Sequence, residues 1–395
     1  MKFEDFKTRN QFSRDEISAF ATGRLLDDAP AGLPELPSAL LIAFHEVTSI
    51  RWDAVSGTGR IEAVRHNELD DWFYPCHFNG DPVMPGCWGV DAAWQCLRFF
   101  AAWRGLIGCA RTLGMENVSF FGQIRPYDKK ITYIVDIVSQ ETSDGETLLT
   151  GKATISVDGT PVYTIGSVSI ATAFWIDDAA AKPSAAPPAD DAPIRKLTYD
   201  EFSAKTKFSH AEIIAIAQGT LIDAPGLEIG LLPSSLMLEV GAIDRITFDE
   251  ATGEGRISAT RDNGPLEWFY PMTPGHKPTV LSIDALWQLM GLFLTWRQNL
   301  GTGRALGFER VEVFGEILPE DRDIRYEITI VRYSRAPNGD AFVRADAKVH
   351  AGGRLILACA NLNVGCHKNI RYSGYPLPSD MALGGKLKMR SEAGS

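Results

Sequence analysis

The stretch that decides the fold runs from Trp72 to Trp103 and reads WFYPCHFNGDPVMPGCWGVDAAWQCLRFFAAW. Its middle part, HFNGDPVMPG, contains two glycines and two prolines, and no helix runs through such a segment. The residues that follow are apolar nearly all round, which is typical of a helix buried in a core. Their polar members Asp91, Gln95 and Arg98 recur at i, i+4 and i+7, so they share one face of that helix.

Three groups in this stretch indicate acid and base chemistry. An unpaired carboxylate costs several kcal/mol to bury, so Asp91 must be hydrogen-bonded, protonated or facing a cavity. His77 lies 91 − 77 = 14 residues earlier, and Gly86 presents a backbone N–H at the start of the helix. The stretch therefore offers a base, an acid and an oxyanion donor. From the residues alone, a core histidine and a structurally held acid are the commoner interpretation.

Composition limits the class of protein. The chain has 395 residues and a net charge of −11, which argues against a nucleic-acid partner because phosphate contacts need a basic surface. The N-terminus has no apolar signal segment, and we expect no membrane-spanning run and a cytoplasmic location. The six cysteines form no C-x-x-C pair, so we expect them to be reduced. Cys76, His77 and Cys87 lack a fourth ligand, and we predict no metal site.

The chain contains an internal repeat. The segment FEDFKTRNQFSRDEISAFATGRL returns as YDEFSAKTKFSHAEIIAIAQGTL. The offset is 208 − 12 = 196 at Phe12 and Phe208, and it falls to 284 − 91 = 193 at Asp91 and Asp284. The second copy has therefore lost three residues in the loop before its buried helix.

The repeat divides the chain into two domains. We predict a first domain over 1–176, an Ala/Pro/Asp linker over 177–195, a second domain over 196–370 and a flexible tail over 371–395. Each copy begins with a short helix after a serine N-cap (13–22 and 209–219) and later contains a long buried helix (87–103 and 279–297). Period-2 alternation in the first copy predicts strands over 117–124, 130–140, 147–157 and 160–171. This pattern predicts an α+β fold, a helix embraced by an antiparallel sheet.

The string CHFNGDPVMPGCWGVDAAWQ resembles the active-site motif of the bacterial 3-hydroxydecanoyl-acyl carrier protein dehydratase/isomerase family. These are hotdog-fold dehydratases, and they include the dehydratase domains of polyunsaturated fatty acid synthases. The likeness continues through RTLGMENVSFFGQIRP (111–126) and, more weakly, back to LPSALL (36–41). It implies a tandem double hotdog whose two copies pair as a pseudo-dimer within one chain. It also implies a dehydratase that converts 3-hydroxyacyl thioesters to trans-2-enoyl thioesters on the phosphopantetheine of acyl carrier protein, without another cofactor.

The resemblance also implies how the site is shared between the copies. In the family, each site combines a histidine from one hotdog with an aspartate from the other. Here His77 would pair with Asp284, supported by Gln288, and the Gly86 N–H would hold the thioester carbonyl. The remaining substrate-binding residues implied are Val83, whose carbonyl would fix the His77 tautomer, Cys87 and Trp88.

The reciprocal site lacks a base. It would combine Asp91 and Gln95 with Thr273, which stands where the histidine is expected. His276 lies only 284 − 276 = 8 residues before its aspartate, so it needs a different loop path to act there. We therefore predict one working site per chain. The alternatives are a hotdog acyl-thioesterase using Asp284 to activate water, and a non-catalytic acyl-binding scaffold. Double-bond isomerisation depends on the shape of the acyl tunnel.

Overall fold

The structure is a computed structural model that describes residues 1–69, 71–174, 194–368, 370, 377–378 and 387–388. The linker predicted over 177–195 lies outside the described residues except for its last two. Most of the tail predicted over 371–395 lies outside them as well.

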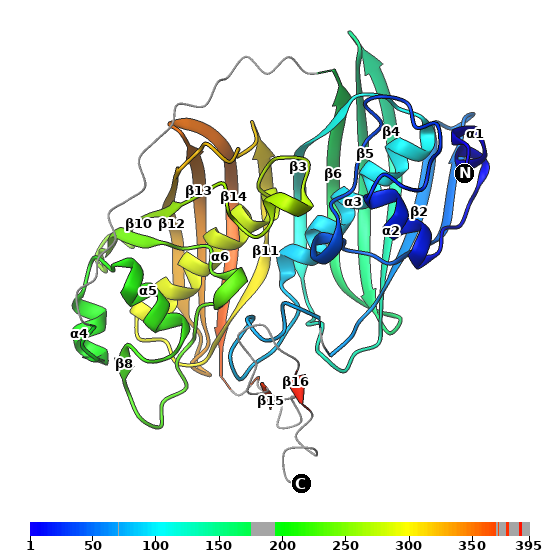
Figure 1. Cartoon of the computed structure of the whole chain (residues 1–395). Coiled ribbons are helices and arrows are strands. Elements are labelled where there is room, and N and C mark those ends of the chain that lie inside the picture. The colour runs from blue at the N-terminus through cyan, green and yellow to red at the C-terminus, as the bar shows by residue number, and fades with distance from the viewer. Residues whose placement is uncertain (70, 175–193, 369, 371–376, 379–386, 389–395) are drawn as a thin grey trace.

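One antiparallel sheet of 12 strands passes through both halves of the molecule (Figure 1). The strand order is β1-β2-β4-β5-β6-β3-β11-β14-β13-β12-β10-β9, and it repeats the same topology when followed inward from either edge. The first half contributes β1 (Glu46–Asp53), β2 (Thr58–His66), β3 (Cys109–Phe120), β4 (Lys130–Ser143), β5 (Glu146–Val157) and β6 (Thr160–Ala173). The second half contributes β9 (Ala242–Phe248), β10 (Gly255–Asp262), β11 (Thr302–Val313), β12 (Asp323–Arg335), β13 (Ala341–Ala351) and β14 (Arg354–His367).

A long helix lies against the sheet in each half. These are α3 (Gly86–Arg104), which contacts β4, β5 and β6, and α6 (Thr279–Trp296), which contacts β11, β13 and β14 (Figure 1). The predicted α+β double hotdog is thus confirmed. The expectation that no apolar segment is long enough to span a membrane was wrong, because α6 passes that test by length and composition. However, 89% of that segment is buried inside the fold, where it forms the core of the second hotdog.

The smaller elements follow local sequence signals. Ser13 and Ser209 close capping boxes with Glu16 and Glu212, as the predicted helix starts require. Asp144 and Gly145, like Asp158 and Gly159, have positive φ and form the tight turns between neighbouring strands. The short helices, 3-10 helices and two-residue strands are α1 (Phe3–Thr8), α2 (Arg14–Ala21), α4 (Tyr199–Ala204), α5 (His210–Ala217), η1 (Ala39–Leu41), η2 (Ser235–Met237), η3 (Tyr270–Met272), β7 (Leu197–Thr198), β8 (Ile222–Asp223), β15 (Leu377–Pro378) and β16 (Leu387–Lys388).

The strand predicted over 117–124 was placed wrongly. β3 begins at Cys109 and ends at Phe120, and the chain then leaves the sheet toward Gly122. A glycine inside the strand, Gly114, and positive φ at Asn117 interrupt the alternation by which strands are recognised.

The two halves join through β3 and β11. Their register is symmetric, because Gly114 pairs with Glu312 while the equivalent Gly307 pairs with Ser119. A Cβ atom at Gly307 would lie 1.9 Å from the Val118 carbonyl oxygen. One at Gly114 would lie 2.4 Å from the Val311 carbonyl oxygen, so glycine is required at both positions for this close approach.

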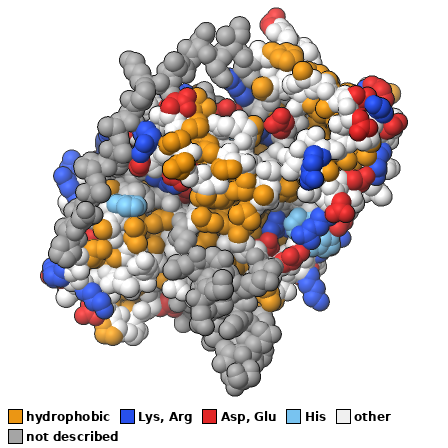
Figure 2. Space-filling model, in the orientation of Figure 1, with side chains coloured by type: hydrophobic (Ala, Val, Ile, Leu, Met, Phe, Trp, Pro, Cys, Tyr) orange, Lys and Arg blue, Asp and Glu red, His pale blue; other side chains and the backbone are white. Residues whose placement is uncertain are grey.

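Loops beside the helices also cross the junction symmetrically. Ser234 N–H donates to the Cys76 carbonyl at 2.8 Å, and Ser38 N–H donates to the Met272 carbonyl at 2.8 Å. Trp72 packs on Trp268, its equivalent in the second copy, with ring centroids 4.9 Å apart. On the face shown in Figure 2, hydrophobic side chains gather near the middle of the molecule. The halves therefore behave as the two members of a pseudo-dimer, and each helps to shape the other's loops.

We predict that Gly307→Ala lowers the free energy of unfolding by roughly 3 kcal/mol or more, since the methyl group meets a backbone oxygen and φ is positive. Gly264→Ala is the matched control, because its Cβ would meet nothing within 4 Å. Denaturant unfolding of the two variants makes the comparison. Equal stability of the Gly307 variant and the control would show that this junction tolerates a side chain.

Candidate active site

His77 is held by the Pro/Gly loop before α3. Its backbone N–H donates to the Phe73 carbonyl at 2.9 Å, and its carbonyl accepts from Val83 N–H at 2.8 Å. The ring is 8% exposed, and its Nδ1 lies 2.9 Å from the Val83 carbonyl oxygen. Because a carbonyl only accepts, Nδ1 carries the hydrogen and Nε2 is left with a free lone pair. The ring is therefore oriented as a base.

Asp284 lies on α6 of the other half. Gln288, one turn later, donates from Nε2 to the Asp284 carboxylate at 2.7 Å. The same amide donates to the Met237 carbonyl at 2.7 Å and accepts from Glu239 N–H at 3.0 Å. Both the nitrogen and the oxygen of the Gln288 amide are thus hydrogen-bonded, so Gln288 fixes the orientation of the Asp284 carboxyl group.

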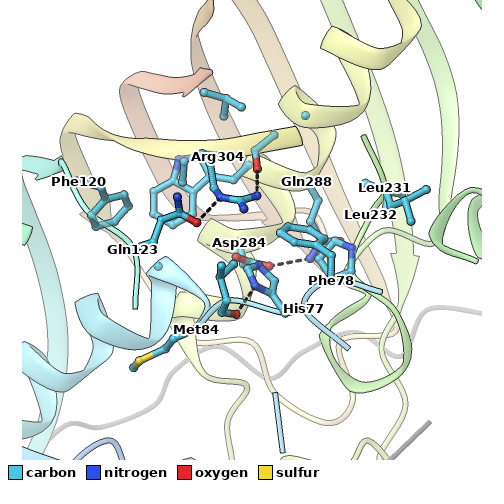
Figure 3. Close-up of a pocket in the computed structure, with 18 of the residues that line it drawn as sticks. His77, Phe78, Met84, Phe120, Gln123, Leu231, Leu232, Asp284, Gln288 and Arg304 are labelled. Atoms are coloured by element: carbon cyan, nitrogen blue, oxygen red, sulfur yellow. Dashed lines mark hydrogen bonds between the residues drawn. The ribbon is translucent and has the colours of Figure 1, made fainter. Parts of the chain in front are cut away.

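His77 and Asp284 face one cavity between the halves (Figure 3). It has a volume of about 90 Å³. Gly86 lies in its wall at the start of α3, and no acceptor for its N–H is found among the described residues. A Cβ atom there would lie 3.1 Å from the Phe120 ring, so a side chain would crowd this wall. The remaining lining residues are Phe78, Val83, Met84, Phe120, Gly122, Gln123, Tyr163, Leu231, Leu232, Pro233, Trp287, Gln288, Gly291, Gly303, Arg304, Ala305 and Val364.

Burial shifts both titratable groups toward their neutral forms. It lowers the pKa of His77 to about 4; the Val83 hydrogen bond opposes this shift and the charge of Arg304 adds to it. Burial raises the pKa of Asp284 to about 6, although hydrogen bonds from Gln288 and the Cys87 thiol act in the opposite direction. A neutral imidazole beside a carboxyl group that holds its proton unusually well suits paired base and acid chemistry.

Two residues implied as substrate contacts lie outside the lining. Trp88 is fully buried and packs on Trp72, with ring centroids 5.3 Å apart. Cys87 is also fully buried, and its thiol acts on Asp284 by lowering the pKa of that carboxyl group. The apolar periodicity of the helix could not distinguish its cavity side from its core side. Among the described residues, no three His, Cys, Asp or Glu side chains are grouped to hold a metal ion.

A buried ion pair that the sequence analysis missed supports the His77 loop. Arg304, on β11, donates to Asp81 at 2.7 Å. It also donates to the Gln123 side-chain oxygen at 3.1 Å (Figure 3). The Asp81 side chain is fully buried. Asp81 stands inside the motif string, and Arg304 repeats Arg111 of the first copy, but only the fold shows that they meet. The loop that carries His77 is thus anchored by the half that carries Asp284.

In the reciprocal cavity, a glutamine again holds the aspartate, but no histidine stands at the position equivalent to His77. Gln95 donates to Asp91 at 2.5 Å and to the Leu41 carbonyl at 2.9 Å, as Gln288 does in its own half. Burial raises the pKa of Asp91 to about 6. Thr273 lines this cavity, whose volume is about 40 Å³.

His276 also lines the reciprocal cavity, which its sequence spacing did not predict. Its Nδ1 lies 3.2 Å from the Lys277 carbonyl, and its Nε2 lies 3.7 Å from the Glu316 carboxylate. In His77 the Nε2 atom is left with a free lone pair, whereas in His276 the Nε2 atom faces the Glu316 carboxylate. Arg98 occupies the same cavity and donates to the Thr112 hydroxyl at 3.1 Å. Ionisable side chains of the protein itself, among them Asp91, Arg98 and His276, thus line this second and smaller space.

Comparison with known families agrees with this architecture. The FabA-like domain family matches residues 36–166 and again residues 232–360, one segment in each hotdog. The class of protein is therefore a tandem hotdog. The chain belongs to the FabA-like domain family and carries that domain twice.

Several solved structures are similar to this chain. The dehydratase domain from the CurJ module of curacin polyketide synthase is 11% identical with a TM-score of 0.47, and the match covers 84% of this chain and 100% of that one. The dehydratase domain of the terminal module of the rifamycin polyketide synthase is 9% identical with a TM-score of 0.45, covering 84% and 98%. A trans-AT polyketide synthase dehydratase domain from Brevibacillus brevis is 12% identical with a TM-score of 0.45, covering 82% and 98%.

We predict that Arg304→Met lowers kcat/KM for the site's substrate by roughly 10- to 100-fold, because the His77 loop loses its anchor and small displacements of a catalytic group are costly. Asp81→Asn should act similarly, and the double variant should lose little more than either single variant. Arg310→Met, on the exposed part of the same strand, is the control. Losses that multiply in the double variant would show that the two residues act independently.

Proposed function

We propose that this protein is a 3-hydroxyacyl thioester dehydratase with one active site per chain. The observation that supports it best is the shared cavity, in which a neutral imidazole from the first hotdog faces a carboxyl group from the second. Gly86, whose N–H has no acceptor among the described residues, lies in the same wall. Elimination of water next to a thioester needs these three functions together.

Each residue of the site has one task in the proposed reaction. The Nε2 atom of His77 takes a proton from C2, and negative charge develops on the thioester oxygen. Gly86 N–H donates to that oxygen, assisted by the N-terminal dipole of α3. The Asp284 carboxyl gives its proton to the hydroxyl on C3. The C3–O bond then breaks, the C2–C3 double bond forms and water leaves. Proton exchange with solvent restores neutral His77 and protonated Asp284.

The substrate is proposed to arrive on acyl carrier protein. We assign the reaction to fatty acid, polyunsaturated fatty acid or polyketide synthesis in the cytoplasm, with the acyl chain on phosphopantetheine. No metal or redox cofactor is assigned, since a side chain of the site accounts for each proton transfer. The same base could remove a proton from C4 of the trans-2-enoyl thioester and return it to C2, which moves the double bond to C3–C4, and an assay for the cis-3-enoyl product decides whether isomerisation occurs.

The two aspartates should be unequal. Asp284→Asn keeps the shape of the side chain but removes the transferable proton, so we expect dehydration to fall by at least roughly 100-fold. Asp91→Asn should retain nearly full activity, because its cavity holds Thr273 and a histidine engaged by Glu316. Turnover of 3-hydroxyacyl thioesters, followed by the enoyl product and by free thiol separately, measures both variants.

His77→Ala is the companion variant, and it should be folded and inactive. An inactive Asp91 variant together with an active Asp284 variant would contradict the composite site. Release of free thiol without enoyl product would instead indicate a thioesterase.

The pH dependence should follow the two shifted groups. His77 must be unprotonated, so kcat/KM should rise as the pH increases through about 4. Asp284 must be protonated, so kcat/KM should fall as the pH increases through about 6. A bell-shaped profile with these two limbs is expected. A rate that continues to rise up to pH 8 would exclude this assignment of acid and base.

A further inference from the structure

Gly291 stands in the interior of α6, where glycine is unfavourable by about 1 kcal/mol relative to alanine. In α3, Gly89 has a packing reason, because a Cβ atom there would lie 2.6 Å from the Tyr163 ring. No packing contact requires glycine at position 291. Apart from its chain neighbours and the nearby backbone of α6, no heavy atom lies within 4 Å of the position that a Cβ atom of residue 291 would take. That open space belongs to the cavity that His77 and Asp284 face.

The position of Gly291 shows that the cavity extends along α6 from Asp284. It follows Asp284 by 291 − 284 = 7 residues, which places it on the same helix face roughly 10 Å farther along the axis. Gly303 on β11 lies beside it, and a Cβ atom there would meet only the Gly291 Cα, at 4.0 Å. Ala305 and Val364 line the same cavity. The residues named here are therefore small or aliphatic. The Arg304 guanidinium lines the same cavity and donates to Asp81, Gln123 and the Gly303 carbonyl.

The first copy shows what happens when the equivalent space is filled. The residue equivalent to Gly291 is Arg98 (291 − 193 = 98), and the residue equivalent to Ala305 is Thr112 (305 − 193 = 112). The Arg98 guanidinium donates to Thr112 at 3.1 Å and lines the reciprocal cavity. The same scaffold thus accepts a large side chain at this position, and in the second copy the position is empty.

We propose that Gly291 determines acyl-chain length in the active cavity. The unbranched carbon chain beyond C3 runs along α6 past Gly291 and ends in the apolar space beside Gly303, Ala305 and Val364. This placement rests on the proposed function, which puts C2 and C3 at His77 and Asp284. The ligand class is a straight, unsubstituted acyl thioester long enough to reach roughly 10 Å beyond the reacting carbons. A short-chain substrate does not reach Gly291.

Gly291→Leu tests this proposal. With 3-hydroxydodecanoyl thioester, kcat/KM should fall by roughly 100-fold, whereas with 3-hydroxybutyryl thioester it should stay within about threefold of wild type. Gly291→Ala should give an intermediate loss. Leucine and alanine are better helix formers than glycine, so α6 should remain folded. Arg98→Leu is the control at the equivalent position of α3, and it should leave the chain-length profile unchanged.

Binding provides a second readout that does not need turnover. Calorimetry with saturated dodecanoyl and butyryl pantetheine thioesters should show a loss of dodecanoyl binding in Gly291→Leu alone. If wild type turns over none of the hydroxyacyl thioesters, the proposed reaction fails, yet this binding comparison still decides the chain path. Equal losses at both lengths, or undiminished dodecanoyl binding and turnover, would overturn the role of Gly291.

Discussion

The antiparallel pairing of β3 with β11 is the contact on which the rest of the structure depends. It makes one sheet from two hotdogs and sets the loop of the first copy against the helix of the second. Gly114 and Gly307 permit it, because a side chain at either position would strike the opposite backbone. The Arg304–Asp81 ion pair then ties the loop to the neighbouring half. His77 and Asp284 come from different copies, so neither half contains both of the residues to which we assign the proton transfers.

Duplication has let the two cavities diverge while the scaffold stayed the same. Gln95 and Gln288 make equivalent hydrogen bonds to their aspartates and to equivalent backbone groups. The differences lie in the side chains that enter each space. Arg98 is the repeat equivalent of Gly291, so an arginine side chain lines the first cavity at the position that is open in the second. In our account, the first copy supplies the base and the second supplies the acid and the acyl tunnel.

The fold could be predicted from the sequence because its signals are local and repeated. The repeat and the buried helices predict two similar α+β domains, and the resemblance of the motif implies that they form a tandem hotdog. His77 and Asp284 follow from the motif and the repeat. Contacts between distant residues could not be predicted. The Arg304–Asp81 pair joins residues that only the sheet brings together. The cavity position of His276 depends on the path of a shortened loop. Trp88 was misplaced because a helix that is apolar all round does not show which side faces a cavity.

The division of labour between the two copies is most directly tested by isotope exchange at C2 in deuterated water. A saturated acyl thioester without the 3-hydroxyl, long enough to occupy the site, isolates proton removal from loss of water. Our account predicts that wild type and Asp284→Asn both exchange the C2 protons, whereas His77→Ala does not. Exchange that persists in the His77 variant and disappears in the Asp284 variant would reverse the two roles and contradict the account.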